Sequence, residues 1–311
     1  MRKKFASPAI VAIPLALLLI MSSCGAAKPG GGKLASSAKG TVIVAGKNFG
    51  EGYVLGWMAA LLIRDSTKLT VDDGKIGMGA TELLYPALKQ GSIDVYADYT
   101  GTIRTTVLKA TAVEHDRQKI WDATVAGIKA GDGVESVGPL GFNNTFAISM
   151  KADAAKRLGI AKLSDLARHP ELRLIGDATT WTRPDAYTGM AAYYGISLKK
   201  GAMVDTNFFY EALEQGQGDV ITAFSTDGKL KKHGLTVLED DRNYYPWYDA
   251  MFLVNGKTAA KYPELVTALA KLKGKLDENT MMGLNEKVDV EKEEPEAVAH
   301  DWLKAQGLIS Q

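Results

Sequence analysis

The strongest constraint on the fold is a pattern that occurs twice. "TELLYPALKQGSIDVYADYTGT" covers residues 81–102, and "FFYEALEQGQGDVITAFSTDG" covers residues 208–228. Each predicts a helix, a glycine that ends it, an apolar strand and a polar turn. Two matching units of this kind predict an α/β protein built from two similar halves.

The ends of the predicted strands locate a ligand site. The apolar residues 41–46 predict a buried strand, and residues 52–65 have the apolar spacing of a helix. Ligands of open α/β sheets lie beyond the carboxyl ends of the strands. The segments "KNFGEG", "YADYTGT" and "AFSTDG" follow such ends, so we expect the functional side chains there.

The N-terminus predicts export. Basic residues at 2–4, an apolar run at 9–20 and small residues before Cys24 indicate a signal peptide over residues 1–23. The alternative is a signal anchor or a short membrane helix, which the two prolines in this region disfavour. Cys24 is the only cysteine, so it cannot form an intramolecular disulfide or a multi-cysteine metal site.

The composition of the next segment excludes a core. Residues 24–40 are mostly Gly, Ala, Ser and Lys, which is typical of a flexible tether, so the folded body starts near Thr41. Without residues 1–23, which hold three basic and no acidic residues, 34 Lys and Arg face 36 Asp and Glu, a formal charge of −2. This balance does not favour nucleic-acid binding.

Seven segments carry a resemblance to a known family. They are, in chain order, "GKNFGEGYVLGWM", "GATELLYPALKQGSIDVYADYTGT", "LGFNNTFAISM", "RPDAYTGM", "EALEQGQGDVITAFSTDG", "VLEDDRNYYPWYDAMFLV" and "LNEKVDVEKEEPEAVAHDWLKAQGL". This order resembles the osmoprotectant-binding proteins of ABC importers, the glycine betaine and choline group. The resemblance implies an α/β, two-lobed periplasmic-binding-protein fold of type II with a ligand cleft between the lobes. Lobe 1 would comprise residues 41–143 plus 248–311, and lobe 2 residues 144–247.

The same resemblance implies a biological setting. The chain would be a monomer that captures a small quaternary amine and delivers it to the permease and ATPase of an importer. The residues before Cys24 resemble a bacterial lipobox, which implies a lipid anchor on Cys24 and a place in the periplasm or at the outer face of the cytoplasmic membrane. Choline, carnitine or a betaine-like thiol-imidazole are alternative ligands, and a ligand-sensing or structural lipoprotein is an alternative function.

A protein binds a quaternary ammonium group mainly through the faces of aromatic rings. This cation cannot donate a conventional hydrogen bond, and each ring face contributes about 0.5–2 kcal/mol when water is excluded. The resemblance assigns this role to Tyr99, Phe146, Phe224 and Tyr248, although the family usually has tyrosine at the two phenylalanine positions. Taken singly, each ring is more often a core residue than part of a ligand cage, and it is their joint placement beside polar turns that favours the cage. Trp181 is either a further ring or a cap on the cleft.

Polar candidates complete the predicted site. By the resemblance, Lys47 and Arg183 hold a ligand carboxylate, Thr102 offers a hydroxyl, and Asn144 places a polar group near the ammonium methyls. The alternative for Arg183 is a salt bridge with Asp185. Two facing basic groups repel each other, so we expect them to favour betaines, which carry a carboxylate, over choline.

Sequence motifs for catalysis are absent. The four histidines lie at no metal-ligand spacing, and the chain has no complete phosphate loop, dinucleotide fingerprint or nucleophile elbow. Adjacent acids in polar turns are usually solvated. We therefore expect binding without turnover, with no metal and no cofactor.

Overall fold

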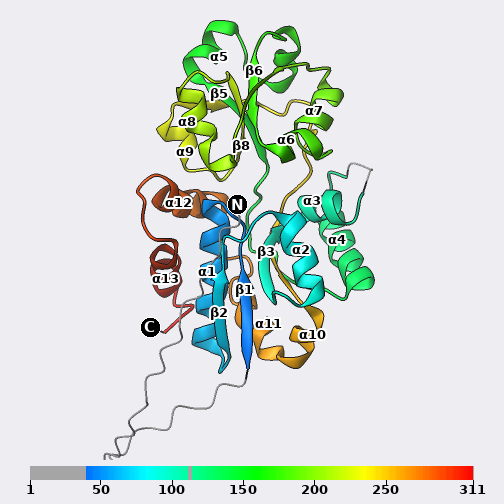
Figure 1. Cartoon of the computed structure of the whole chain (residues 1–311), viewed down its shortest axis with the longest axis vertical. Helices are drawn as coiled ribbons and strands as arrows, with labels where there is room; N and C mark the ends of the chain where they lie inside the picture. Colours follow the sequence, from blue (N-terminus) through cyan, green and yellow to red (C-terminus); the bar gives the residue numbers. More distant parts are fainter. Residues whose placement is uncertain (1–39, 111–113, 311) are drawn as a thin grey trace, which may run out of the picture. The chain divides into compact units, whose positions relative to one another are not determined.

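The computed structural model describes residues 40–110 and 114–310. The predicted signal peptide and the predicted lipidation site at Cys24 lie outside these residues. The described chain forms two five-stranded sheets, each flanked by helices (Figure 1). We call the first sheet with its helices the first lobe, and the second sheet with its helices the second lobe.

The first lobe combines an N-terminal and a C-terminal segment. Its sheet has the order β2-β1-β3-β10-β4, and β10 runs antiparallel to both of its neighbours. The strands are β1 (Thr41–Ala45), β2 (Thr70–Lys75), β3 (Val95–Tyr99), β4 (Glu135–Val137) and β10 (Ala250–Val254). The helices are α1 (Gly50–Ser66), α2 (Thr81–Gln90), α3 (Thr100–Thr102), η1 (Ile103–Val107), α4 (Arg117–Asp132), α10 (Gly256–Lys261), α11 (Pro263–Ala270), α12 (Glu278–Asp289) and α13 (Pro295–Ala305).

The second lobe repeats this topology with one continuous segment. Its sheet has the order β7-β6-β8-β5-β9, and here β5 is antiparallel to both of its neighbours. The strands are β5 (Phe146–Lys151), β6 (Arg173–Gly176), β7 (Lys199–Met203), β8 (Val220–Phe224) and β9 (Leu235–Val237). The helices are α5 (Ala152–Leu158), η2 (Leu163–Arg168), α6 (Ala178–Thr182), α7 (Tyr187–Tyr194), η3 (Thr206–Phe208), α8 (Phe209–Glu214) and α9 (Lys229–Lys232).

The repeated sequence pattern forms the predicted elements. Helix α2 ends at Gly91, whose φ of 76° is left-handed, and β3 follows. Helix α8 is followed by Gly216 with a φ of 68°, and then by β8. Glycine adopts this backbone without a Cβ penalty, which explains why it ends both helices. The predicted strand and helix at the N-terminus are also confirmed, as β1 and α1.

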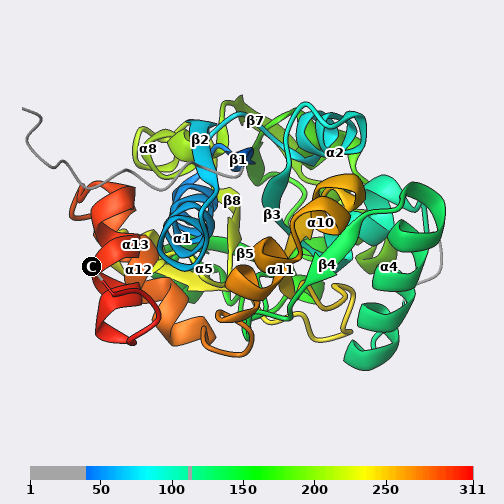
Figure 2. The ribbon, with the colours of Figure 1, turned by 90° about the horizontal axis from the view of Figure 1, so that it is seen from below.

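Helices cover both faces of the first sheet (Figure 2). On one face, Leu55 and Met58 of α1 pack with Val44 of β1. On the other face, Leu88 of α2 packs with Tyr96 of β3. Burying both faces buries every residue of β3, all of them apolar or aromatic except Asp98, and leaves the strand ends as the place for a site.

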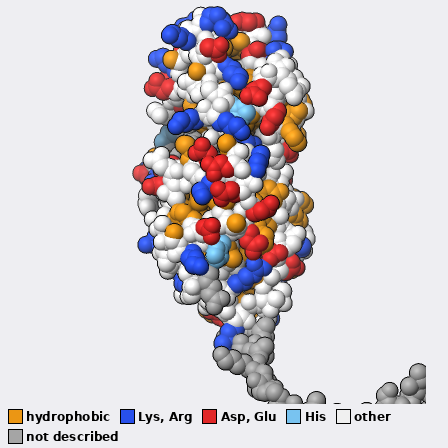
Figure 3. All heavy atoms as spheres, turned by 90° about the vertical axis from the view of Figure 1, so that its left-hand side faces the viewer, with side chains coloured by type: hydrophobic (Ala, Val, Ile, Leu, Met, Phe, Trp, Pro, Cys, Tyr) orange, Lys and Arg blue, Asp and Glu red, His pale blue; other side chains and the backbone are white. Residues whose placement is uncertain are grey.

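The surface and helices show two further properties. On the face in Figure 3, Lys and Arg side chains are interspersed with Asp and Glu, and the described residues there form no continuous basic surface. Among residues 40–110 and 114–310, no helix is long and apolar enough to cross a membrane.

Candidate functional site

The candidate site lies where the chain enters and leaves the second lobe. Phe146, the first residue of β5, pairs with Phe224, the last residue of β8. The last residue of β3, Tyr99, pairs with the first residue of β10. We call the two chain segments that connect the lobes the crossings. They run beside each other, because Asn143 forms a β-bridge with Asp249. Strand register therefore brings both crossings to the polar ends of the two sheets.

Five aromatic side chains form a connected group at this place. The ring of Phe146 is central, with centroid distances of 5.6 Å to Phe224, 5.3 Å to Tyr245 and 5.8 Å to Tyr248. Phe49 extends the group, at 5.9 Å from Phe224. We call these five residues the aromatic wall. Because Phe49 belongs to the first lobe and Phe224 to the second, the wall crosses from one lobe to the other.

The structure brings together three of the four predicted rings. Phe146, Phe224 and Tyr248 belong to the aromatic wall, whereas Tyr99 stands apart, with the Lys47 ammonium 4.8 Å from its ring centroid. The sequence analysis missed Phe49 and Tyr245. Both lie inside segments that carried the family resemblance, "KNFGEG" and "NYYPWY", and this placement was the available signal.

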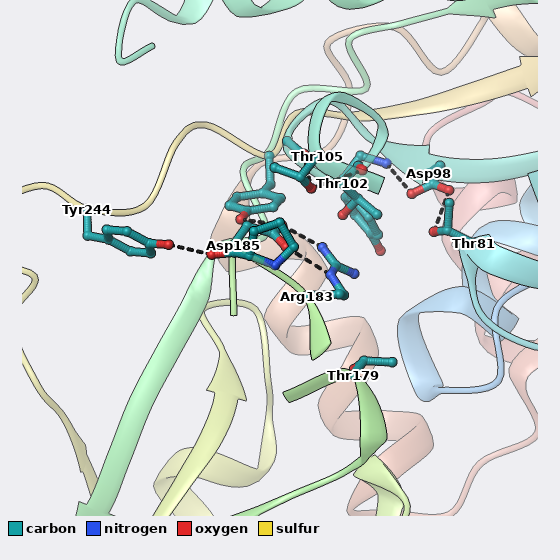
Figure 4. Close-up of polar contacts among 12 residues, drawn as sticks. Thr81, Asp98, Thr102, Thr105, Thr179, Arg183, Asp185 and Tyr244 are labelled. Carbon is teal, nitrogen blue, oxygen red and sulfur yellow. Dashed lines mark hydrogen bonds and ion pairs between the residues drawn. The ribbon is translucent and has the colours of Figure 1, made fainter. Parts of the chain in front are cut away.

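Lys47 is held in a buried ion pair. Its ammonium donates to Asp98 at 2.6 Å. The Thr81 hydroxyl donates to the other Asp98 oxygen at 2.9 Å (Figure 4). Asp98 is fully buried, and the Lys47 side chain is 9% exposed. The aspartate neutralises the lysine but uses only one of its three N–H donors.

Arg183 forms the salt bridge with Asp185 that the sequence analysis left open. The contact is bidentate, with N–O distances of 2.9 and 2.6 Å, and the Tyr248 hydroxyl donates to the same carboxylate at 3.0 Å (Figure 4). Burial lowers the pKa of Arg183, but the charge and the hydrogen bonds of Asp185, together with smaller charge contributions from neighbouring groups, raise it, and the pKa is raised on balance. The guanidinium also lies 5.8 Å from the Phe146 ring centroid.

These two ion pairs correct one part of the sequence analysis. The expected repulsion between two free basic groups does not exist, because Lys47 and Arg183 each have an aspartate partner. A ligand carboxylate is therefore not needed to neutralise them. Both side chains retain unused N–H donors, so they can still bind one.

Glu51 is the largest finding that the sequence analysis missed. Its carboxyl is buried and accepts four hydrogen bonds, from Tyr99 and Asn144 on one oxygen and from Thr226 and Asn285 on the other. Burial raises the pKa of Glu51, and the four hydrogen bonds oppose that rise.

The remaining predicted residues are Thr102, Asn144 and Trp181. Thr102 is buried in α3, directly behind β3, and Figure 4 labels it. Asn144 donates to Glu51, and its Oδ1 has no hydrogen-bond partner among the described residues. The Trp181 ring packs edge-on against Tyr187, with 5.1 Å between centroids. Trp181 is therefore not a member of the aromatic wall.

Cavities lie around the wall: Tyr245 lines one of about 450 Å³ with Arg242 and Trp247, and two others lie close to the candidate site. One of about 370 Å³ is lined by Gly101 and Thr105 behind β3 and by Asp185 and Tyr244 from the second lobe. The other, of about 30 Å³, is lined by several of the residues around Glu51 and by the rings of Phe49 and Phe224. The second has about the room of one water molecule. A trimethylammonium group can therefore enter between Phe49 and Phe224 only if this second cavity becomes larger.

In the described part of the chain, no three or more His, Cys, Asp or Glu side chains are arranged so that they could hold a metal ion. The chemistry available at the site is thus ring faces, hydroxyls, two ion pairs and one buried carboxyl. Groups of this kind suit a small organic cation or zwitterion, and a site for one between two lobes is the design of an extracytoplasmic solute-binding protein.

Comparison with known proteins gives the family. The chain belongs to the family described as the substrate binding domain of ABC-type glycine betaine transport systems, whose model matches residues 40–305. Proteins of this family serve transporters and not enzymatic reactions, and the two-lobed periplasmic-binding-protein fold expected from the sequence is confirmed.

Individual relatives cover the chain to different extents. It is 30% identical over 307 residues to the carnitine transport binding protein OpuCC of Listeria monocytogenes, covering 98% of this chain and 97% of that protein. It is 32% identical over 269 residues to the ergothioneine transport permease/ergothioneine binding protein EgtU of Helicobacter pylori. This match covers 86% of this chain but only 48% of that protein.

A solved structure shows the same fold. The crystal structure of a glycine betaine/carnitine/choline ABC transporter superposes with a TM-score of 0.69 at 30% identity, covering 86% of this chain and all of that chain. The expectation of a solute-binding protein for quaternary-amine osmoprotectants thus agrees with the family and with its relatives.

Proposed function

We propose that the two lobes close on a quaternary amine of the glycine betaine type and present it to the permease and ATPase of an ABC importer. In this proposal, residues 41–143 plus 248–311 act as one lobe and residues 144–247 as the other. The aromatic wall is the single observation that carries the proposal, because it unites rings from both lobes at the two crossings. Lys47, Tyr99, Thr102, Asn144, Phe146, Arg183, Phe224 and Tyr248 are the proposed ligand-binding residues.

Ring faces supply most of the attraction in this proposal. Each face that meets the ammonium contributes about 0.5–2 kcal/mol, so three to four of them supply about 1.5–8 kcal/mol, and a micromolar site, at about 8 kcal/mol, needs polar contacts as well. Of the four aromatic residues proposed to bind the ligand, Phe146 and Phe224 have no hydroxyl, and only Tyr99 and Tyr248 carry one. The Tyr248 and Tyr99 hydroxyls already donate to Asp185 and Glu51, which holds these two rings in place.

A thermal-shift screen tests the ligand class. Glycine betaine, choline, carnitine and ergothioneine would each be added to ligand-free protein. A bound ligand at 100 times its dissociation constant stabilises the folded protein by about 2.7 kcal/mol, which raises the melting temperature clearly. No shift with any of the four compounds would contradict a quaternary-amine site.

Replacing Phe224 with alanine should weaken glycine betaine binding by about 1–3 kcal/mol, because the ammonium loses one ring face and the neighbouring rings lose a contact. Isothermal titration calorimetry on refolded, ligand-free protein measures this loss. Phe208→Ala is the matched control, since that ring is 59% exposed and belongs to no part of the wall. Equal affinities of the two variants would exclude Phe224 from the site.

Replacing Arg183 with glutamine should change ligand preference. The substitution leaves the buried Asp185 without its cation, so the carboxylate attracts a ligand of net positive charge and repels a ligand carboxylate. The ratio of glycine betaine affinity to choline affinity should therefore fall about tenfold or more. Calorimetry with both ligands measures the ratio. An unchanged ratio, with both ligands weakened alike, would assign Arg183 a structural role only.

We also propose that Cys24 carries a lipid and that the chain works as an anchored monomer outside the cytoplasmic membrane. The support is the sequence alone, with its apolar run before Cys24 and its tether behind it. Mass spectrometry of protein from the membrane fraction should find a diacylglyceryl group on Cys24. The Cys24→Ser variant should be released, and its retention on the membrane would contradict the anchor.

A further inference from the structure

One carboxyl group joins four separate segments of the chain. Glu51 at the start of α1 accepts from Tyr99 at 2.6 Å and from Asn144 at 2.7 Å. It also accepts from Thr226 at 2.6 Å and from Asn285 at 2.8 Å. Tyr99 ends β3, Asn144 lies in the first crossing, Thr226 follows β8 of the second lobe, and Asn285 belongs to α12. The contact with Thr226 is therefore a hydrogen bond between the lobes.

The loop that carries Thr226 is held against α12 at more than one point. Besides donating to Glu51, the Asn285 amide donates to the Thr226 carbonyl oxygen at 2.8 Å. Two residues later, a Cβ placed on Gly228 would lie 2.6 Å from the backbone of Glu286. Only glycine permits backbones to approach this closely. The loop after β8 thus docks directly on α12 of the first lobe, and Ser225 of the same loop is hydrogen-bonded to Asn143 and Thr145 in the first crossing.

This junction is connected to the aromatic wall. Thr226 follows Phe224 by two residues, so fixing the threonine fixes the end of the strand that carries the ring. On the other side, the Tyr99 hydroxyl donates to the same carboxyl group. Glu51, Phe49 and Phe224 also line one small cavity. A shift of the second lobe relative to the first must therefore break the Glu51–Thr226 hydrogen bond and move the wall together.

We propose that Glu51 is a latch between the lobes, a positioning residue that stabilises the arrangement seen here against separation and so couples lobe closure to the placement of the rings. The inference rests on the proposed function in one respect, that lobe closure accompanies ligand capture. A single carboxylate suits this task because it only accepts, with two oxygens that serve four donors at once.

Two substitutions remove the latch to different degrees. Glu51→Gln keeps the shape of the side chain but replaces one carboxyl oxygen with an NH2 group, which donates and does not accept. The two hydrogen bonds to that oxygen are therefore lost. Thr226→Val is milder, because it removes only the hydroxyl that crosses between the lobes. The control is Thr222→Val in β8, the strand before Thr226, since the buried Thr222 hydroxyl has no hydrogen-bond partner in the described part of the chain.

The separation of the lobes is measured directly with two spin labels. Lys156→Cys on α5 and Lys273→Cys behind α11 place one label on an exposed position of each lobe. The full chain also carries Cys24→Ser, which removes its only cysteine. Pulsed electron–electron double resonance then gives the distribution of distances between the two spin labels. It is measured with and without glycine betaine for the parent protein and the three variants.

The latch predicts that Thr226→Val lowers the ratio of short to long distances about tenfold and that Glu51→Gln lowers it further, while Thr222→Val leaves it unchanged. The concentration of glycine betaine needed to restore the short distance rises by the same factors. Distributions of Glu51→Gln and Thr226→Val that match the control in both conditions would overturn the latch. So would weaker binding without any change in distance, or a parent protein that never shows the short distance.

The same experiment separates the latch from the proposed ligand. If glycine betaine leaves the parent distribution unchanged and gives no thermal shift, the ligand assignment fails. The ligand-free distributions then still decide the latch, because it acts between protein groups alone. If betaine binds but the variants behave like the control, the ligand assignment stands and the latch fails.

Discussion

Replacing Asp98 with alanine should destabilise the folded chain by about 3–5 kcal/mol. The substitution leaves the buried Lys47 ammonium without a counter-charge, and removing one partner of a buried ion pair has a cost of this size. It also leaves the Thr81 hydroxyl and the Tyr99 amide, at 2.9 and 2.8 Å from Asp98, without their acceptor. Urea unfolding followed by circular dichroism measures the loss as a lower midpoint at unchanged slope.

A double variant is the control for this prediction. Replacing Asp98 with alanine and Lys47 with methionine together removes both charges, and apolar replacement of a whole buried pair is often nearly neutral. The double variant should therefore be more stable than Asp98→Ala alone. If Asp98→Ala costs less than about 1 kcal/mol, or if the second substitution adds to the loss, Lys47 does not depend on this carboxylate.

Replacing Asp289 with asparagine should stabilise the protein at neutral pH. Asp289 ends α12 and packs against α1, where a Cβ on Gly50 would lie 2.5 Å from both carboxylate oxygens. Burial, opposed by Lys229 and reinforced by Asp227, raises the pKa of Asp289 from 3.8 to about 6. Because the folded state binds this proton more tightly than the unfolded state, the stabilising contribution is present below about pH 4 and is lost as the pH rises through 6.

The size and the control follow from the same linkage. A shift of about two pKa units corresponds to about 3 kcal/mol. The advantage of Asp289→Asn over the parent should therefore be about 3 kcal/mol larger at pH 7.5 than at pH 4, as measured by urea unfolding at both values. Asp301→Asn on α13 is the control, since that side chain is 78% exposed. A difference that does not depend on pH would mean that Asp289 titrates normally in the folded protein.

The secondary structure was largely predictable because local pattern decides it. Apolar spacing located α1, α2 and β3, and the glycines after α2 and α8 have the left-handed backbone that ends a helix. The site was predictable only in part. Phe146, Phe224 and Tyr248 do come together, but their roles toward a ligand remain proposals, and Phe49 and Tyr245 gave no distinct signal of their own.

The charged groups of the site were not predictable, because their behaviour depends on partners that lie far away in the sequence. Lys47 finds Asp98 across 51 residues, and Glu51 finds Asn285 across 234. A lysine beside a buried aspartate and a lysine in solvent have the same sequence context. Only the packed structure distinguishes them.

By itself, the sequence determined the two α/β halves, the strand ends at which polar and aromatic residues collect, and the family. The halves and the strand ends follow from periodicity and from residues adjacent in the chain, whereas the family follows from the resemblance of seven ordered segments. The tertiary structure decided which rings touch, that both basic candidates are neutralised by aspartates, and that one buried glutamate links the lobes. The physical reason is that burial and electrostatic pairing are properties of neighbours in space, and folding brings these neighbours together from all parts of the chain.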